Sequence, residues 1–192
     1  MNKLFFFLSI LSFNFSYSQD LREKCKLGKT YFEELYKVDA NAIKCLSKNS
    51  DKKNTIFLTF ARWCAPCMWH LNGFMKLQEN YNVDLYILLV DKENSNMAYL
   101  AKEYAFDVFP KAKIAIISDV EGRGKSKKYR KFLDEITPKQ FENIDDMSKY
   151  IVLDNNGEIK LVTSYKDDNG TDWKDDSAMV KRLVEPLLEK KQ

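Results

Sequence analysis

The order of apolar segments along the chain predicts an α/β protein with parallel strands at its centre. Residues 55–61 and 84–91 are short, nearly continuous apolar runs, as is typical of strands buried on both faces of a sheet. Apolar side chains recur at helical spacing over 65–81 and around 97–104, and a third apolar run follows at 111–117. This alternation favours parallel strand pairing, with helices packed against the sheet.

The segments on either side of this unit complete the predicted architecture. Apolar residues at helical spacing over 20–48 predict two helices before the first buried strand. Residues 150–163 contain an Asn-Gly pair, which supplies the positive φ angles of a tight turn, and therefore predict a β-hairpin. Residues 180–188 predict a C-terminal amphipathic helix, which Pro186 should bend or end.

Residues 118–149 interrupt the alternation and form an insertion before the predicted hairpin. Thr137, followed by a proline and then by a glutamine three residues after the threonine, predicts the start of a short helix. The insertion also contains a basic cluster, which fits either a surface for acidic partners or an ordinary solvated face. The members of this cluster are Arg123, Lys125, Lys127, Lys128, Arg130 and Lys131.

The first 18 residues have the features of a secretory signal peptide. Lys3 precedes an apolar run of about ten residues, and Ser16 and Ser18 supply a small-x-small cleavage pattern. The run is shorter than the ~20 residues that a membrane helix needs, although an uncleaved anchor is the alternative. We therefore expect residues 1–18 to be a signal peptide and residues 19–192 to form one domain. This domain would be exported, periplasmic or secreted, without a stable membrane span.

The charge balance bears on the class of partner. The chain of 192 residues carries a formal net charge of +3 at pH 7, which gives no argument for nucleic-acid binding. An aromatic content of 14 % supports a packed globular domain.

The cysteine pair Cys64 and Cys67 is the strongest functional signal. It follows directly on the first buried strand, with Trp63 before it and Pro66 within it, and it opens the helix predicted over 65–81. At a helix N-terminus, free backbone N–H groups and the helix dipole favour a thiolate at Cys64. Cys67, one turn further on, can attack a mixed disulfide formed through Cys64. The local pattern therefore predicts thiol–disulfide redox chemistry.

The other two cysteines, Cys25 and Cys45, flank an amphipathic segment. If Cys64 and Cys67 form one pair, Cys25 and Cys45 are left to form a second, structural disulfide, and an exported protein can keep such a bridge. The alternative is that both are ordinary buried thiols.

Two segments resemble motifs of the thioredoxin superfamily, and specifically of its exported redoxin-like members. The run F-A-R-W-C-A-P-C at 60–67 is similar to the family's F-x-x-W-C-x-P-C. Residues 101–110, which end in Phe109 and Pro110, are similar to the segment that leads into the family's cis-proline. The resemblance implies a thioredoxin-like fold with a central mixed β-sheet flanked by helices. It also implies that Cys64 is the exposed nucleophile and Cys67 the resolving thiol.

The resemblance further implies that the Phe109–Pro110 bond is cis and lies beside the cysteine pair, where Phe109 can offer its backbone to a substrate. The alternative is an ordinary trans proline that opens a strand. In the family topology the strand before residues 118–149 runs away from the cysteine pair, so the insertion should lie off the site.

Three positions depart from the family pattern. Leu58 stands where many members have a buried acid, six residues before the nucleophilic cysteine. His70, the only histidine, stands where some exported reductases have a glutamate. Either His70 exchanges the proton of Cys67, which lies three residues earlier on the helix, or it is a surface histidine. Lys111 follows the proline, where a small polar residue is common.

Other chemistries fit the residues less well. Covalent haem attachment is excluded because Met68, not a histidine, follows Cys67. A zinc site built from Cys64, Cys67 and His70 lacks a second ligand pair, and the acids over 167–176 lack the spacing of a calcium loop. We expect neither a metal nor an organic cofactor.

These observations predict an exported thiol–disulfide oxidoreductase that reduces or exchanges disulfides in partner proteins. Its partners would be cysteine-containing protein substrates and a redox-recycling protein, and Trp63, Pro66 and Pro110 would shape its site. The Ala-Pro pair between the cysteines favours a reductase. The alternative is a thioredoxin-fold interaction or assembly module without essential redox activity, with the basic cluster as its contact surface.

Overall fold

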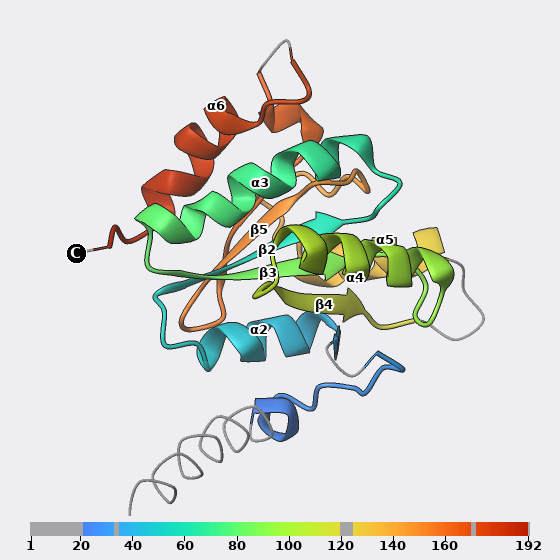
Figure 1. The fold of residues 1–192 in the computed structure, drawn as a ribbon. Helices are drawn as coiled ribbons and strands as arrows, with labels where there is room; N and C mark the ends of the chain where they lie inside the picture. The colour runs from blue at the N-terminus through green and yellow to red at the C-terminus, as the bar shows by residue number, and fades with distance from the viewer. Residues whose placement is uncertain (1–20, 33–34, 120–124, 170–171, 192) are drawn as a thin grey trace, which may run out of the picture.

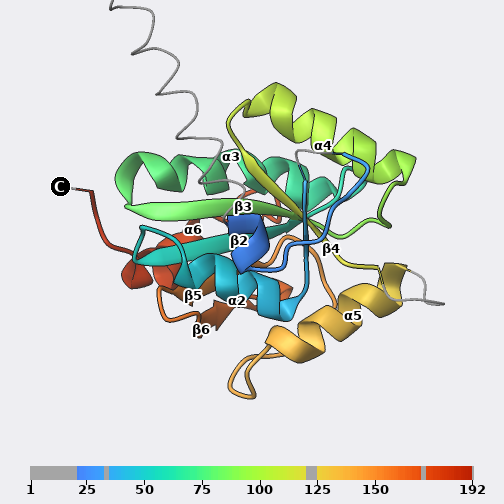
Figure 2. The ribbon, with the colours of Figure 1, turned by 90° about the horizontal axis from the view of Figure 1, so that it is seen from below.

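The computed structural model describes residues 21–32, 35–119, 125–169 and 172–191, and within them a six-stranded mixed sheet carries helices on both faces (Figures 1 and 2). The strand order is β1-β4-β3-β2-β5-β6. The first four of these strands are parallel to their neighbours, and β5 and β6 extend the sheet by antiparallel pairing. The predicted fold class is therefore confirmed. The predicted signal peptide, residues 1–18, lies outside the described residues.

The first strand, β1 (Tyr36–Val38), and the helix α2 (Ala40–Lys48) precede the central strand. Of the two helices predicted over 20–48, α2 forms, and its N-terminus is capped by the side chain of Asp39. The earlier helical prediction is wrong around Tyr36, because this residue pairs with Ala115 at the edge of the sheet. The apolar side chains there reach the core from extended chain, where sheet pairing satisfies the backbone.

The central unit follows the predicted alternation. Every residue of β2 (Asn54–Phe60) and β3 (Val83–Leu89) is buried, which explains the continuous apolar runs of these strands. The connecting helices are α3 (Ala65–Asn80) and α4 (Asn96–Val108), and β4 (Lys113–Ile117) ends the unit.

The insertion contributes the helix α5 (Lys125–Ile136). The helix predicted to begin at Thr137 is wrong, because the Thr137 N–H completes α5 by donating to the carbonyl of Leu133. Within the basic cluster, Lys128 is buried, whereas Lys127, Arg130 and Lys131 are exposed. The described part of the cluster is therefore mainly a solvated face. Lys128 is the exception, since it donates to the carbonyls of Asp91 and Ile117.

The predicted hairpin is present as β5 (Tyr150–Asp154) and β6 (Ile159–Val162). Gly157 in its turn has a φ of +74°, which a residue with a Cβ rarely adopts. A short 3₁₀ turn, η1 (Tyr165–Asp167), follows β6. The C-terminal helical segment consists of α6 (Ser177–Met179), η2 (Val180–Val184) and η3 (Glu185–Leu187), and Pro186 lies in its last turn, as predicted.

The helices divide between the two faces of the sheet. Figure 1 shows α3 and α6 above the sheet and α2 below it. Figure 2, seen from below, shows α5 beside α2. Right-handed crossovers from β2 to β3 and from β3 to β4 place α4 on the face of α3. One continuous core of buried side chains from both faces and from the sheet holds these layers together.

Strand direction decides which loops meet at the cysteine pair. Because β2, β3 and β4 are parallel, the turn before β4 lies at the opposite end of the sheet from the pair that follows β2. The predicted position of Pro110 beside the pair is therefore wrong. β4 also runs toward the cysteine end, so the expectation that the insertion lies away from the site is wrong as well. The last residues of the insertion, just before β5, return to this same end.

The disulfide that the sequence left open, Cys25 with Cys45, is present on the face of the sheet opposite α3. It joins α2 to the short helical stretch at 21–24. The side-chain amide of Asn49 contacts both sulfur atoms. This bridge closes a chain segment of 20 residues and ties the N-terminal segment to the domain.

We predict that the double variant Cys25→Ser/Cys45→Ser is less stable than the wild type by about 3 kcal/mol, because the unfolded chain loses a loop constraint. Urea unfolding measures this difference. The matched control is Cys64→Ser/Cys67→Ser, which opens a much shorter loop and should cost less. Equal costs for the two double variants would contradict this account.

Candidate functional site

The Cys64–Cys67 disulfide lies at the amino end of α3, where β2 leaves the sheet. Cys64 is the N-cap residue, and its Sγ accepts the backbone N–H of Cys67 at 3.2 Å. Pro66 occupies the first turn, where its missing N–H removes no helical hydrogen bond. Cys64 is 6 % exposed and Cys67 is 0 % exposed, so a partner can approach only the first sulfur.

The Trp63 indole fixes the loop before the cysteines. Its Nε1–H donates to a carboxylate oxygen of Asp91 at 2.9 Å. Asp91 is buried just after β3, and the carbonyl of Asp91 also accepts from Lys128 of α5. A hydrogen bond to a charged group holds its partners more firmly than a neutral one. The indole is thereby oriented beside Cys64, with 46 % of the residue exposed.

His70 is buried one turn after Cys67, so its interpretation as a surface histidine is wrong. Its Nε2 lies 3.1 Å from the carbonyl oxygen of Trp173, which can only accept, so Nε2 carries a proton. Its Nδ1 lies 2.7 Å from the Ser148 hydroxyl and 3.5 Å from a carboxylate oxygen of Asp176. In the neutral imidazole, Nδ1 accepts from Ser148; in the protonated form, it can donate to Ser148 or pair with Asp176.

Ser148 is held in an unusual backbone conformation at this point. Its φ is +66°, in the left-handed region, which costs a residue with a Cβ roughly 1–2 kcal/mol. The surroundings compensate for this cost, since the Ser148 hydroxyl bonds to His70 and the next residue, Lys149, is buried with its Nζ donating to the carbonyl of Thr163. Lys149 also pairs with Asp146. The loop before β5 is therefore fixed against the end of β6.

Asp176 supplies a buried carboxylate behind His70. Burial raises the pKa of Asp176 above that of an ordinary aspartate, although hydrogen bonding from Tyr150 and the nearby His70 oppose this shift. The Tyr150 hydroxyl donates to the Asp176 Oδ2 at 2.6 Å. Burial also raises the pKa of Tyr150 well above its ordinary value, so the hydroxyl remains a donor. We call Ser148, His70, Asp176 and Tyr150 the buried polar cluster.

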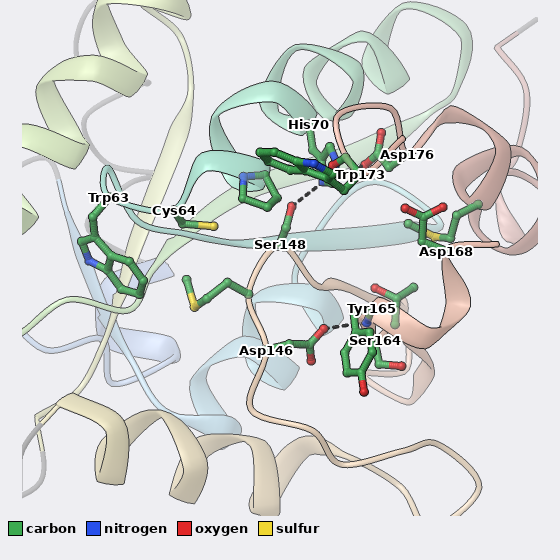
Figure 3. A pocket seen from close by; sticks show the side chains of 14 residues that line it. Trp63, Cys64, His70, Asp146, Ser148, Ser164, Tyr165, Asp168, Trp173 and Asp176 are labelled. Atoms are coloured by element: carbon green, nitrogen blue, oxygen red, sulfur yellow. Dashed lines mark hydrogen bonds and ion pairs between the residues drawn. The ribbon is translucent and has the colours of Figure 1, made fainter. Parts of the chain in front are cut away.

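A cavity of about 550 Å³ opens beside Cys64 and has the buried polar cluster in its wall (Figure 3). The cysteine loop and α3 form one side, the loop before β5 forms a second, and the segment after β6 forms the third. In Figure 3, Trp63 and Cys64 lie at one end and Tyr165 and Asp168 at the other. The lining residues are Trp63, Cys64, Pro66, His70, Asp146, Met147, Ser148, Thr163, Ser164, Tyr165, Asp168, Trp173, Asp176 and Met179.

Five residues singled out from the sequence come together here: Cys64, Cys67, Trp63, Pro66 and His70. These residues lie close together because all of them stand in the first turns of α3 or in the loop just before it.

Phe109 and Pro110 are absent from this site. No peptide bond among the described residues is cis, so the predicted cis-proline is not found. Instead, the N–H of Ala112 donates to the carbonyl of Phe109. Pro110 takes the second position of this turn, where a trans proline is favoured. Lys111, in the same turn, is exposed.

The sequence pattern did not reveal the site residues that come from β5, from the loop before it and from the C-terminal segment. Met147, Ser148, Tyr150, Trp173 and Asp176 reach the site only through sheet pairing and the packing of distant segments. The sequence showed the group of acids over 167–176, but nothing in it indicated which of them is buried.

Two absences hold for the residues that the structure describes. No group of three or more His, Cys, Asp or Glu side chains is arranged to hold a metal ion. No helix combines the length and apolar character needed to cross a membrane.

The mixed sheet, its covering helices and the cysteine pair at the start of α3 define a thioredoxin-like fold, as the resemblance implied. No protein-family model matches the chain, and no curated protein sequence matches it significantly.

Three solved structures show a distant similarity to the chain. A protein of Bacteroides vulgatus assigned as a thiol-disulfide oxidoreductase is 19 % identical over 71 % of this chain and 74 % of its own, with a TM-score of 0.40. StoA from Bacillus subtilis is 14 % identical over 60 % of this chain and 75 % of its own, with a TM-score of 0.40. The reduced N-terminal domain of PilB from N. meningitidis is 14 % identical over 86 % and 96 %, with a TM-score of 0.44.

We predict that Tyr150→Phe lowers the free energy of unfolding more at pH 7.5 than at pH 4. The loss at pH 7.5 should be about 1–3 kcal/mol. The folded-state pKa of Asp176 is raised, so the stability associated with its protonated form is lost as pH rises through that pKa. Without the tyrosine donor the pKa rises further, and more stability is lost. Urea unfolding at both pH values tests this.

Tyr129→Phe is the matched control, because the buried Tyr129 hydroxyl donates to the backbone carbonyl of Asp146, which does not titrate. Its cost should be the same at both pH values. A pH-independent cost for Tyr150→Phe would show that its hydroxyl does not act on an ionised carboxylate.

Proposed function

We propose that this chain is an exported thiol–disulfide oxidoreductase that exchanges disulfides with cysteine-containing proteins through Cys64 and Cys67. The observation that carries the proposal is the position of this disulfide at the amino end of α3, with Cys64 in the wall of an open cavity and Cys67 fully buried behind it. The apolar run before residue 18 supports export, with residues 19–192 as the mature domain.

The difference in exposure supports different roles for the two sulfurs. In the reducing direction, the Cys64 thiolate attacks a substrate disulfide, one substrate sulfur leaves as a thiolate, and a mixed disulfide forms. The Cys67 thiolate then attacks Cys64, the Cys64–Cys67 bond forms, and the second substrate sulfur leaves. Two electrons pass from the cysteine pair to the substrate, and a recycling dithiol protein returns the pair to the reduced state.

The oxidising direction reverses each step. The Ala-Pro pair between the cysteines favours the reducing direction, and a measured reduction potential decides between the two.

The reduced Cys67 must exchange its proton with a neighbouring group, because no part of it is exposed to water. His70 lies on the same face of α3, three residues later, and contacts Ser148 and Asp176 within the buried polar cluster. We assign to His70 the transfer of this proton during resolution of the mixed disulfide. Trp63 and Pro66 hold the loop in which the attack takes place.

The first functional prediction concerns the two cysteines. Cys64→Ala should abolish disulfide reduction, because no sulfur remains in the cavity wall to be attacked. Cys67→Ser should still form the mixed disulfide through Cys64 but should not turn over. Reduction of a model disulfide protein, together with gel analysis of trapped adducts, measures both effects.

The same variant separates enzyme from interaction module. Full retention of biological activity in Cys64→Ala would contradict the enzyme proposal and favour a thioredoxin-fold assembly protein.

The second functional prediction concerns His70. His70→Ala should slow resolution of the mixed disulfide by about 10²-fold, the usual contribution of a positioned acid–base group. The reaction of Cys64 with iodoacetamide should change little, and added imidazole should restore part of the lost rate. Slow turnover that imidazole does not rescue, in a variant with an unchanged melting temperature, would contradict the assignment.

A further inference from the structure

The cavity beside Cys64 is larger than the exchange of two sulfurs requires. Its volume of about 550 Å³ falls within the usual range of small-ligand pockets. It extends from the cysteine to the segment after β6, where Tyr165 and Asp168 lie (Figure 3). Any group that occupies it must come close to the disulfide, because Cys64 is part of its wall.

The apolar part of the lining consists mainly of aromatic and thioether side chains. Trp173 is 50 % exposed and Tyr165 is 63 % exposed, although both are large apolar residues. Exposed tryptophan and tyrosine residues are common where proteins bind partners, because they offer a large contact area at a small entropic cost. Met147 and Met179 add polarisable sulfur atoms, which favour contact with aromatic rings.

Trp173 is held in place before any ligand arrives. Its ring packs against the ring of Trp69 at a centroid distance of 4.3 Å and an interplanar angle of 44°, and Lys174 lies over the Trp69 ring. Its backbone carbonyl accepts from His70 of the buried polar cluster. A side chain that is already positioned loses little freedom when a ligand binds to it.

The lining offers an anionic ligand little positive charge. Among its lining residues His70 is the single basic side chain, and three carboxylates, Asp146, Asp168 and Asp176, line the cavity, of which Asp146 is paired with Lys149. A small acidic thiol such as glutathione would bring further carboxylates toward these groups. An uncharged apolar group attached to the reacting sulfur avoids this repulsion.

We propose that this cavity binds a bulky apolar side chain, preferably aromatic, that lies next to the reacting cysteine in a polypeptide substrate. This inference rests on the proposed function, because it names the substrate class of the same site. Trp173 and Tyr165 form the contact surface for that side chain while Cys64 reacts with the neighbouring sulfur. Recognition of this kind directs the cysteine pair to apolar cysteine-containing segments.

The test uses Cys67→Ser, in which Cys64 is a free thiol and the mixed disulfide accumulates. Three peptides carry one cysteine activated as a thiopyridyl disulfide and differ only in the residue before it, which is Phe, Ser or Glu. Release of thiopyridone gives the rate constant for each. We expect the Phe peptide to react about tenfold faster than the Ser peptide, and the Glu peptide to react slowest.

Adding Trp173→Ala to this variant should reduce the Phe-to-Ser ratio to below about threefold. Tyr99→Ala is the matched control, since Tyr99 of α4 is 44 % exposed and does not line the cavity, and it should leave the ratio unchanged. Tyr165→Ala provides a second cavity variant, in which the ratio should also fall.

The two proposals fail in different ways. Equal rates for the Phe and Ser peptides, or a ratio that survives both cavity substitutions, would overturn the inference and leave the oxidoreductase proposal standing. Absence of reaction with all three peptides, while the thiol remains titratable in the unfolded protein, would overturn the proposed function and the inference with it.

Discussion

The antiparallel pairing of β5 with β2 is the constraint on which the rest of the site depends. Because Tyr150 lies opposite Leu58, the loop before β5 must end beside the cysteine pair that follows β2. The return strand β6 then brings the segment after residue 162 to the same end of the sheet. Without this pairing, Cys64 would stand at the end of a parallel sheet with no second wall.

The buried polar cluster places a carboxylate in the core although position 58 is apolar. Leu58 is buried in the middle of β2, and the sequence pattern leaves no acid near it. The carboxylate of the cluster belongs to Asp176, before α6, and is held by Tyr150 from the strand adjacent to β2. A buried carboxylate without such donors would be costly, so the tyrosine and the acid are required together.

The two disulfides lie on opposite faces of the sheet and join different segments of the chain. Cys25–Cys45 ties the N-terminal segment to α2 and lies far from the cavity in the fold, whereas Cys64–Cys67 lies in the cavity wall. In the proposed reaction, the second bond opens and closes while the first continues to support the domain. The Trp63–Asp91 hydrogen bond links the cysteine loop to the end of β3. The buried polar cluster links α3 to β5, because His70 and Tyr150 both contact Asp176.

The amino-acid sequence by itself determined the α/β class, the central strands, the hairpin and the cysteine pair at a helix start, because these are local patterns of period, turn chemistry and capping. It could not decide the direction of β4. Because β4 is parallel to β3, Pro110 lies at the end of the sheet away from the site, and the insertion begins at the same end as the site. Nor could it identify Ser148, Tyr150, Trp173 or Asp176 as neighbours of His70, since they are separated from it by about 80 to 106 residues. Tertiary structure decided these contacts, because long-range pairing and burial depend on the whole sheet.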